Sequence, residues 1–244
     1  MKHLLLVGML IPLCASAQTP APAPAPAAPD AGPAKPRHIV FHPTATDDGG
    51  VAPIQIGGGS RGGEDLGVTL ETLVPEQTAL TTQAQPSLYW YQSKTTDAEC
   101  EVTLTQPKVA KPLLSLKTGK ATPPGIHAIR LSKFNVELKP NVVYQWSVAV
   151  IVDPTSRSGD IYARGVIKRI DPSPELAAKL AAAADADKPA IYAENGIWYD
   201  ALQSISDQID KAPTDQSLRD ERASLLDQVK LKGAQMESSS AKSP

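Results

Sequence analysis

Between residues 66 and 170, apolar and polar residues alternate with a period close to two, which is the pattern of strands that bury one face. The clearest stretch runs from Val142 to Val152, where every second residue is apolar while Gln145 and Ser147 fall on the other face. Pro, Gly, Asn and Asp, which favour turns, separate the segments. The predicted strands are Val68–Val74, Ser87–Gln92, Cys100–Thr105, Leu113–Lys117, Ile126–Leu131, Val142–Val152 and Ile161–Ile170. Seven short strands in succession predict a β-sandwich over residues 64–171.

Two local features narrow the kind of sandwich. The segment Leu138–Tyr144 has the Leu-x-Pro-x-x-x-Tyr spacing of a tyrosine corner, in which the Tyr144 hydroxyl bonds back to the preceding turn. Alternation also turns Leu88 and Trp90 inward on the second strand. The domain therefore resembles an immunoglobulin-like or fibronectin type III sandwich of about seven strands. Because Cys100 has no disulfide partner once a leader is removed, the fibronectin-like variant is favoured.

From Ser173 onward the spacing of apolar residues changes to three and four, which predicts amphipathic helices over residues 172–232. Ser173 is placed to cap the first helix, and Pro174 suits its first turn. A second apolar stripe follows at Leu218–Val229. The best-defined apolar face consists of Trp198, Ala201, Leu202, Ile205 and Ile209.

Residues 188–213 also carry the spacing of one tetratricopeptide-like helical hairpin. Gly196 would allow the tight turn between its two helices, and Ala201 their close approach. A single repeat has no neighbouring repeat to cover its apolar face. We therefore expect the hairpin to pack partly against the sandwich and partly against a helix over Thr214–Lys230.

The beginning of the chain predicts export. Residues 1–17 read as a signal peptide, with a short basic start, an apolar run and small residues before Gln18. The apolar run Leu4–Leu13 is too short to cross about 30 Å of hydrocarbon, so no transmembrane segment is expected. Leu13 stands where a lipoprotein signal has a small residue, which favours simple secretion over a lipid anchor at Cys14. The predicted location is the periplasm or the outside of the cell.

Both ends of the mature chain have the composition of disordered segments. Thr19–Pro36 contains seven Pro and seven Ala, so we expect an extended spacer within a linker over residues 18–63. The polar residues 233–244 are predicted to form a disordered tail. The glycine run at 56–63 is not a nucleotide site, because no clear strand leads into it and no Gly-Lys-Ser/Thr closes it.

Charge and reactive residues argue against several functions. Lys plus Arg is 24 and Asp plus Glu is 26, which gives a net charge of −2 and no basic surface for nucleic acid or an anionic membrane. His38 and His42 precede a proline in an extended stretch, which is unsuited to a zinc pair. His127 stands alone in a strand as a rim residue, and alternation buries Cys100. We therefore expect no metal, no cofactor and no enzyme activity.

The sequence offers two places where a partner could bind. The loop Asp153–Asp160 joins the two longest strands, and Asp153, Arg157 and Asp160 serve either local turn bonding or contact with a partner. The first reading is favoured, because loop carboxylates and arginines usually stabilise the turn itself. The second place is Tyr199, for which there are also two readings. An aromatic residue here is more often a core or helix-interface residue, but Tyr199 lies beside the apolar helix stripe and not on it, so the alternative is an exposed peptide contact next to a helical groove.

Six segments, taken in order, resemble those of the bacterial domain of unknown function 928 family. The resemblance covers most of residues 57–231 and implies an exported bacterial protein with a β domain followed by helices. It carries no catalytic residues, since the family has no established activity. The segments are Gly57–Gly62, Leu70–Glu76, Pro86–Tyr91, Tyr144–Trp146, Asp153–Asp160 and Tyr192–Leu202.

Three functions remain open at this point. The favoured one is a non-catalytic interaction protein that offers loops and a groove to an envelope protein or a cell-surface polymer. The first alternative is a cell-envelope hydrolase that uses carboxylates such as Glu194 and Asp200, whose spacing places them on different helices. The second alternative is a structural spacer in an envelope assembly.

Overall fold

The computed structural model describes residues 38–44, 66–231 and 233–235. All of them belong to one compact unit that spans residues 34–244. The predicted signal peptide, Cys14, the Pro/Ala-rich spacer and the glycine run lie outside the described residues, as does the tail beyond residue 235.

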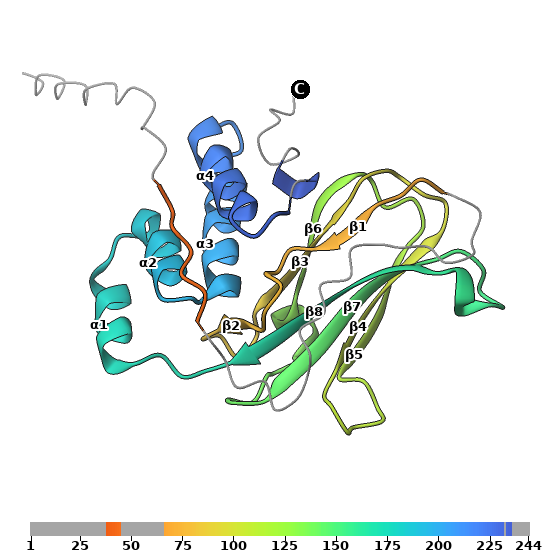
Figure 1. Ribbon diagram of the computed structural model, residues 1–244, viewed down its shortest axis with the longest axis horizontal. Helices are drawn as coiled ribbons and strands as arrows, with labels where there is room; N and C mark the ends of the chain where they lie inside the picture. Colours follow the sequence, from red (N-terminus) through yellow and green to blue (C-terminus); the bar gives the residue numbers. More distant parts are fainter. Residues whose placement is uncertain (1–37, 45–65, 232, 236–244) are drawn as a thin grey trace, which may run out of the picture. The chain divides into compact units, whose positions relative to one another are not determined.

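Two β-sheets form the first half of the unit (Figure 1). A three-stranded sheet has the order β1-β3-β6, and a five-stranded sheet has the order β2-β8-β7-β4-β5. All pairs are antiparallel except β2 with β8. The strands are β1 Leu70–Thr72, β2 Ala79–Thr81, β3 Ser87–Gln92, β4 Glu99–Thr105, β5 Leu114–Gly119, β6 Gly125–Arg130, β7 Val143–Ile151 and β8 Ile161–Arg169.

Each of the seven predicted strands is present, with ends that differ from the prediction by no more than two residues, but the sequence prediction missed β2. This strand has only three residues, and all three are buried. It lacks the alternation that marks the other strands, because it is enclosed on both faces and pairs in parallel with the end of β8. The described part of the chain therefore contains eight strands where the sequence predicted seven.

The core between the sheets follows the predicted alternation. Tyr144 and Trp146 are 1% exposed, and Leu88 is fully buried on the facing sheet. The backbone N–H of Lys139 donates to the Tyr144 hydroxyl at 3.0 Å, which is the hydrogen bond of the predicted tyrosine corner. Cys100 is also buried, as predicted, with its Sγ 3.4 Å from the side-chain oxygen of Gln92.

The helices follow the strands. Ser173 caps the first of them, as predicted, by accepting from the Leu176 backbone N–H at 3.1 Å. The predicted hairpin is the second and third helices, and Gly196 lies in its turn with a φ of +73°. The helices are α1 Pro174–Ala182, α2 Lys188–Glu194, α3 Trp198–Lys211 and α4 Gln216–Asp227, with short 3-10 turns at η1 Leu131–Phe134, η2 Arg157–Gly159 and η3 Asp185–Asp187.

Helix α3 joins the helices to the sheets. At its start the Trp198 indole N–H donates to the Leu73 carbonyl at 2.7 Å. Further along, Asp207 forms an ion pair with Arg130 of β6, with 2.6 Å between the charged atoms. The apolar residues of both sheets, α2, α3 and α4 form one continuous buried cluster. As expected, the sandwich covers part of the hairpin and α4 covers another part.

Two short segments differ from the predicted disorder. His38–Thr44, within the predicted linker, packs against the helices, with Ile39 1% and Phe41 9% exposed. Residues 233–235, at the start of the predicted tail, form a helical turn in which Ala234 is fully buried. Burial of apolar side chains holds both segments in place. Each segment covers part of the core that the neighbouring elements do not cover. Among the described residues, no helix has the length and apolar character needed to cross a bilayer.

Candidate functional site

An extended segment of the chain, His38–Thr44, lies against the helices and is called here the docked segment (Figure 1). The side chain of Gln228, just after α4, holds its backbone at two points. Its oxygen accepts from the Phe41 N–H at 2.8 Å, and its amide N–H donates to the Ile39 carbonyl at 2.8 Å. The His42 N–H donates to the Ala193 carbonyl at 3.1 Å. These bonds recognise main-chain groups, so they would fit an extended chain of almost any sequence.

Side chains add specificity to the contact between the docked segment and the helices. The Phe41 ring meets the Trp198 ring edge-on, with 4.9 Å between ring centroids. Gly196 allows the backbone to approach closely, because a Cβ at that position would lie 2.9 Å from the His42 carbonyl oxygen. The glycine that the turn of the hairpin needs thus also makes room for the docked segment.

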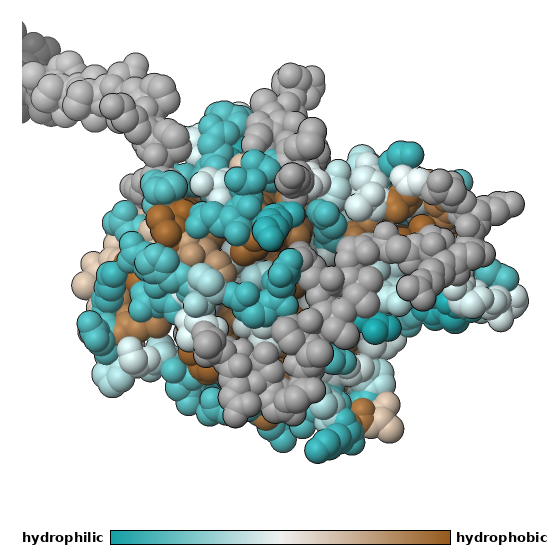
Figure 2. All heavy atoms as spheres, in the orientation of Figure 1, coloured by the Kyte–Doolittle hydropathy of each residue, from teal (hydrophilic) through white to brown (hydrophobic). Residues whose placement is uncertain are grey.

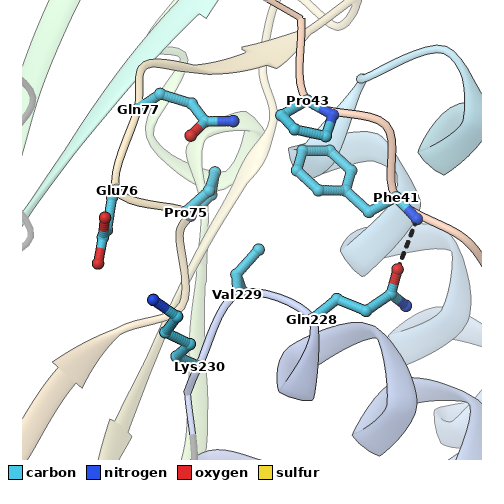
Figure 3. Close-up of a pocket in the computed structure, with 8 residues that line it drawn as sticks. All are labelled: Phe41, Pro43, Pro75, Glu76, Gln77, Gln228, Val229 and Lys230. Atoms are coloured by element: carbon cyan, nitrogen blue, oxygen red, sulfur yellow. Dashed lines mark hydrogen bonds between the residues drawn. The ribbon is translucent and has the colours of Figure 1, made fainter.

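A pocket of about 150 Å³, called here the junction pocket, opens beside the docked segment (Figure 3). Figure 3 shows Val229 and Pro75 facing each other across it, with the Phe41 and Pro43 rings at one side. Over the helices, apolar atoms reach the surface between polar ones (Figure 2). The lining residues come from three distant parts of the chain and are Phe41, Pro43, Pro75, Glu76, Gln77, Gln228, Val229 and Lys230.

The size and the lining of the junction pocket limit what it accepts. A cavity of about 150 Å³ holds a molecule the size of benzene, so this pocket suits one apolar side chain and not a whole cofactor. Glu76 and Lys230 carry opposite charges at its margin, and Gln77 adds an amide. An apolar centre with a polar margin is the arrangement in which one buried side chain anchors a protein–protein contact.

The predicted loop Asp153–Asp160 is tied to itself and to the neighbouring strand. Arg157 forms an ion pair through its Nε with Asp160, and its other end contacts Glu101 of β4 at 2.8 Å. The Arg157 guanidinium holds the pKa of the Glu101 carboxyl below its usual range. Asp160 is 8% exposed and accepts from the Val152 N–H at 3.3 Å. Arg157 and Asp160 therefore stabilise the turn.

Asp153 closes the start of the same loop. One of its oxygens accepts from the Thr155 N–H and hydroxyl, each at 2.8 Å, and these bonds lower the pKa of the Asp153 carboxyl. All three predicted residues of this loop thus have local roles. Contact of Asp153, Arg157 and Asp160 with a partner stays a prediction.

Of the two readings of Tyr199, the core residue is correct and the exposed peptide contact is wrong. Tyr199 is 1% exposed, and its hydroxyl reaches the core of the sandwich. The hydroxyl accepts from the Trp146 indole N–H at 2.8 Å and donates to the Val166 carbonyl at 3.2 Å. Burial raises the pKa of the Tyr199 phenol far above its usual range. Tyr199 is buried because α3 is covered on more sides than its apolar stripe indicates.

The two carboxylates considered for hydrolysis have separate partners. Asp200 is 1% exposed and accepts from the Thr81 hydroxyl at 2.5 Å and from the Thr82 N–H at 2.9 Å. Burial raises the pKa of Asp200, while these hydrogen bonds act in the opposite direction. Glu194 forms an exposed ion pair with Lys179 at 3.2 Å. Asp200 thus links α3 to the end of β2, and Glu194 links α2 to α1.

The structure also locates the histidines. His38 and His42 lie on the docked segment, and His127 lies on β6, where its Nε2 donates to the Pro123 carbonyl at 2.8 Å. In the part of the chain that is described, no three His, Cys, Asp or Glu residues are grouped closely enough to hold a metal ion.

Sequence reasoning missed the docked segment and the junction pocket. One signal was present, since Ile39, Val40 and Phe41 form an apolar run inside an otherwise polar and proline-rich stretch. Gln228 gave no signal, because an exposed glutamine near the end of a helix has no distinctive pattern around it.

The model of the family described as Domain of Unknown Function (DUF928) matches residues 56–240, which is most of the chain. The chain belongs to this family. A search of the curated proteins finds no match to it.

Proposed function

We propose that this protein is an exported, non-catalytic binding protein of the bacterial envelope, which holds an extended segment of a partner protein. The junction pocket would receive one apolar side chain of that segment. Export is supported by the leader pattern of residues 1–17, which predicts the periplasm or the outside of the cell.

The proposal rests on the surface that holds the docked segment, which is called here the seat and consists of the Gln228 side chain and the Ala193 carbonyl. This surface already holds one extended chain by its main-chain groups, through Gln228 and the Ala193 carbonyl. The junction pocket continues directly from that seat, since Phe41 and Gln228 contribute to both. A partner chain that follows the docked segment would find an apolar pocket for its anchor side chain and the Gln77 amide for its backbone.

The β domain in this proposal is an immunoglobulin-like sandwich of the fibronectin type III kind. In such folds the corner tyrosine begins a strand that lies between two others in one sheet. Tyr144 begins β7, which lies between β4 and β8. A rigid sandwich of this kind would serve as the scaffold that fixes α3 and the pocket. The α2–α3 hairpin would be a single tetratricopeptide-like unit.

The test is photo-crosslinking in intact cells that produce the full chain. A photo-reactive amino acid at position Gln77, on the pocket margin, should give an adduct with one envelope protein. The variant Val229→Trp fills the pocket with a large ring and should abolish that adduct. Val109→Trp makes the same change on an exposed loop, where Val109 is 45% exposed, and should leave the adduct intact.

The pocket proposal fails if the adduct survives in Val229→Trp while the variant melts like the parent. It also fails if mass spectrometry places the crosslink in a partner segment without any apolar residue. Absence of an adduct, together with turnover of cell-wall material by the purified protein, would favour the hydrolase alternative.

A further inference from the structure

The docked segment His38–Thr44 is also a wall of the junction pocket. Phe41 and Pro43, which both belong to it, line the pocket, and Figure 3 shows their rings at one side. The facing surface comes from Pro75 and Val229, which belong to other parts of the chain. The pocket therefore has its full shape only while the docked segment is in its seat.

Few contacts hold the docked segment there. Two of its backbone groups bond to the Gln228 side chain, and a third bonds to the Ala193 carbonyl. Ile39 and Phe41 are buried, while the other residues of the segment are half-buried or exposed. Segments with few buried side chains open at a lower free energy than the core of a protein does. We therefore expect the docked segment to leave and re-enter its seat while the sheets and helices stay folded.

Undocking would change the site in two ways. The rings of Phe41 and Pro43 would leave, so an apolar side chain in the pocket would lose the surface on that side. The Trp198 ring, which is fully buried and meets the Phe41 ring at 4.9 Å between centroids, would lose its cover. The undocked form is thus a poorer receptor for a single apolar side chain, because part of the surface that would enclose it is gone.

A ligand that binds one form of a protein better than another shifts the equilibrium towards that form. We infer, resting on the proposed function, that docking of His38–Thr44 and binding of the partner segment are coupled. The junction pocket accepts its apolar anchor when the docked segment is seated, and the bound partner in turn holds the segment in place, since such coupling is reciprocal. The docked segment is therefore a movable wall that regulates the site.

The opposite arrangement is displacement, in which the partner takes the place of the docked segment. Coupling is favoured because the Gln228 side chain already uses its oxygen and its amide N–H on the docked segment. The pocket beside Phe41 offers apolar surface to an added side chain without breaking either bond. The two arrangements predict opposite effects of the partner on the docked segment.

The test uses the adduct formed in intact cells through a photo-reactive amino acid at position Gln77 of the full chain. Ile39→Asp puts a charge where the side chain is 1% exposed, so it should undock the segment and reduce the adduct by about tenfold or more. Val40→Asp is the matched control. It adds the same charge to the next residue, which is half-buried, and should leave the adduct nearly unchanged. Neither residue is among those that line the pocket.

Hydrogen exchange distinguishes coupling from displacement. The purified adduct is compared with the free full chain. The amides of Phe41 and His42, which donate to Gln228 and Ala193, should exchange more slowly in the adduct by about tenfold or more. Faster exchange of both amides in the adduct would show displacement and would overturn the inference.

Gly196→Ala is a second undocking variant, so the test does not depend on the folding of Ile39→Asp. A Cβ at Gly196 would crowd the His42 carbonyl from a position outside the pocket lining, and this variant should lose the adduct in the same way. An undiminished adduct in a variant whose His42 amide has lost its protection would contradict the coupling alone. Absence of an adduct from the parent chain would overturn the proposed function as well, so the two failures are distinguishable.

Discussion

The hydroxyl group of Tyr199 connects helix α3 with two hydrogen-bonding groups inside the sandwich. It accepts from the Trp146 indole N–H and donates to the Val166 carbonyl, so it satisfies two buried groups. Gly165 makes this arrangement possible, because a Cβ there would lie 2.7 Å from the Trp146 indole nitrogen. The Tyr199 hydroxyl thus joins α3, β7 and β8 through the Trp146 side chain and the Val166 backbone.

The variant Tyr199→Phe removes only the hydroxyl group and therefore tests its contribution to stability. The variant should lose about 1–3 kcal/mol of unfolding free energy, because both partners of the hydroxyl become unpaired in the core. Chemical denaturation measures the loss. Tyr162→Phe is the control, since Tyr162 is half-buried on β8 with its ring against Arg164, and should change stability by less than about 0.5 kcal/mol. Equal effects in both variants would contradict the role given to the Tyr199 hydroxyl.

Among the elements, the α2–α3 hairpin has a second role besides packing. Its turn residue, Gly196, has a positive φ and also faces the docked segment. Local geometry and a contact between distant parts of the chain therefore depend on the same residue. Only the first of these could be predicted, because the tetratricopeptide-like spacing describes the hairpin and says nothing about what covers it.

Gly196→Ala separates the two roles when it is compared with Gly119→Ala. Gly119 also has a positive φ, +88°, but a Cβ there would meet nothing within 4 Å. Gly119→Ala should therefore lower the free energy of unfolding only through backbone strain at the positive φ, by about 1–2 kcal/mol. Gly196→Ala should lower the free energy of unfolding by about 1–3 kcal/mol more than Gly119→Ala does, because the docked segment must move away from the added methyl group.

Hydrogen exchange provides the specific measurement for this pair. The His42 amide, which donates to Ala193, should exchange faster in Gly196→Ala and at the parental rate in Gly119→Ala. If the two variants lose equal stability and His42 stays protected in both, the docked segment does not depend on the space at Gly196.

For the whole molecule, the central feature is that sheets and helices share one apolar core. Buried residues from the docked segment, both sheets and α2–α4 belong to the same cluster, while a smaller cluster joins β2 to α1, α2 and Ile197. Helix α3 contributes to the larger cluster. It also bonds to the Leu73 carbonyl just after β1, to β2 through Asp200 and to β6 through Asp207. Separate unfolding of the helices would expose a large part of the core of the sandwich.

We therefore expect one cooperative unfolding transition. Far-ultraviolet circular dichroism, which follows the helices, and tryptophan fluorescence, which is dominated by Trp90, Trp146 and Trp198, should give the same midpoint in denaturant. Phe41→Ala should shift both curves together and lower the unfolding free energy by about 3 kcal/mol. Two separate midpoints, or a shift in one curve only, would mean that helices and sandwich are independent units.

Local sequence patterns are enough to predict the alternating strands, the tyrosine corner, the cap at Ser173 and the turn at Gly196. Each of these depends on the spacing of residues close together in the chain, through strand or helix periodicity or a local hydrogen bond. The predictions for Leu88, Tyr144 and Cys100 were correct for this reason, since alternation alone fixes which face of a strand they occupy.

Packing between distant parts of the chain sets the position of Tyr199, the existence of β2, the docked segment and the junction pocket. Tyr199 lies next to the apolar stripe of α3, and its burial depends on a second surface that wraps the helix. Strand β2 is too short for a periodic signal and exists because β8 offers it a partner. The junction pocket is formed by residues from three distant parts of the chain, so no local pattern contains the information that brings them together.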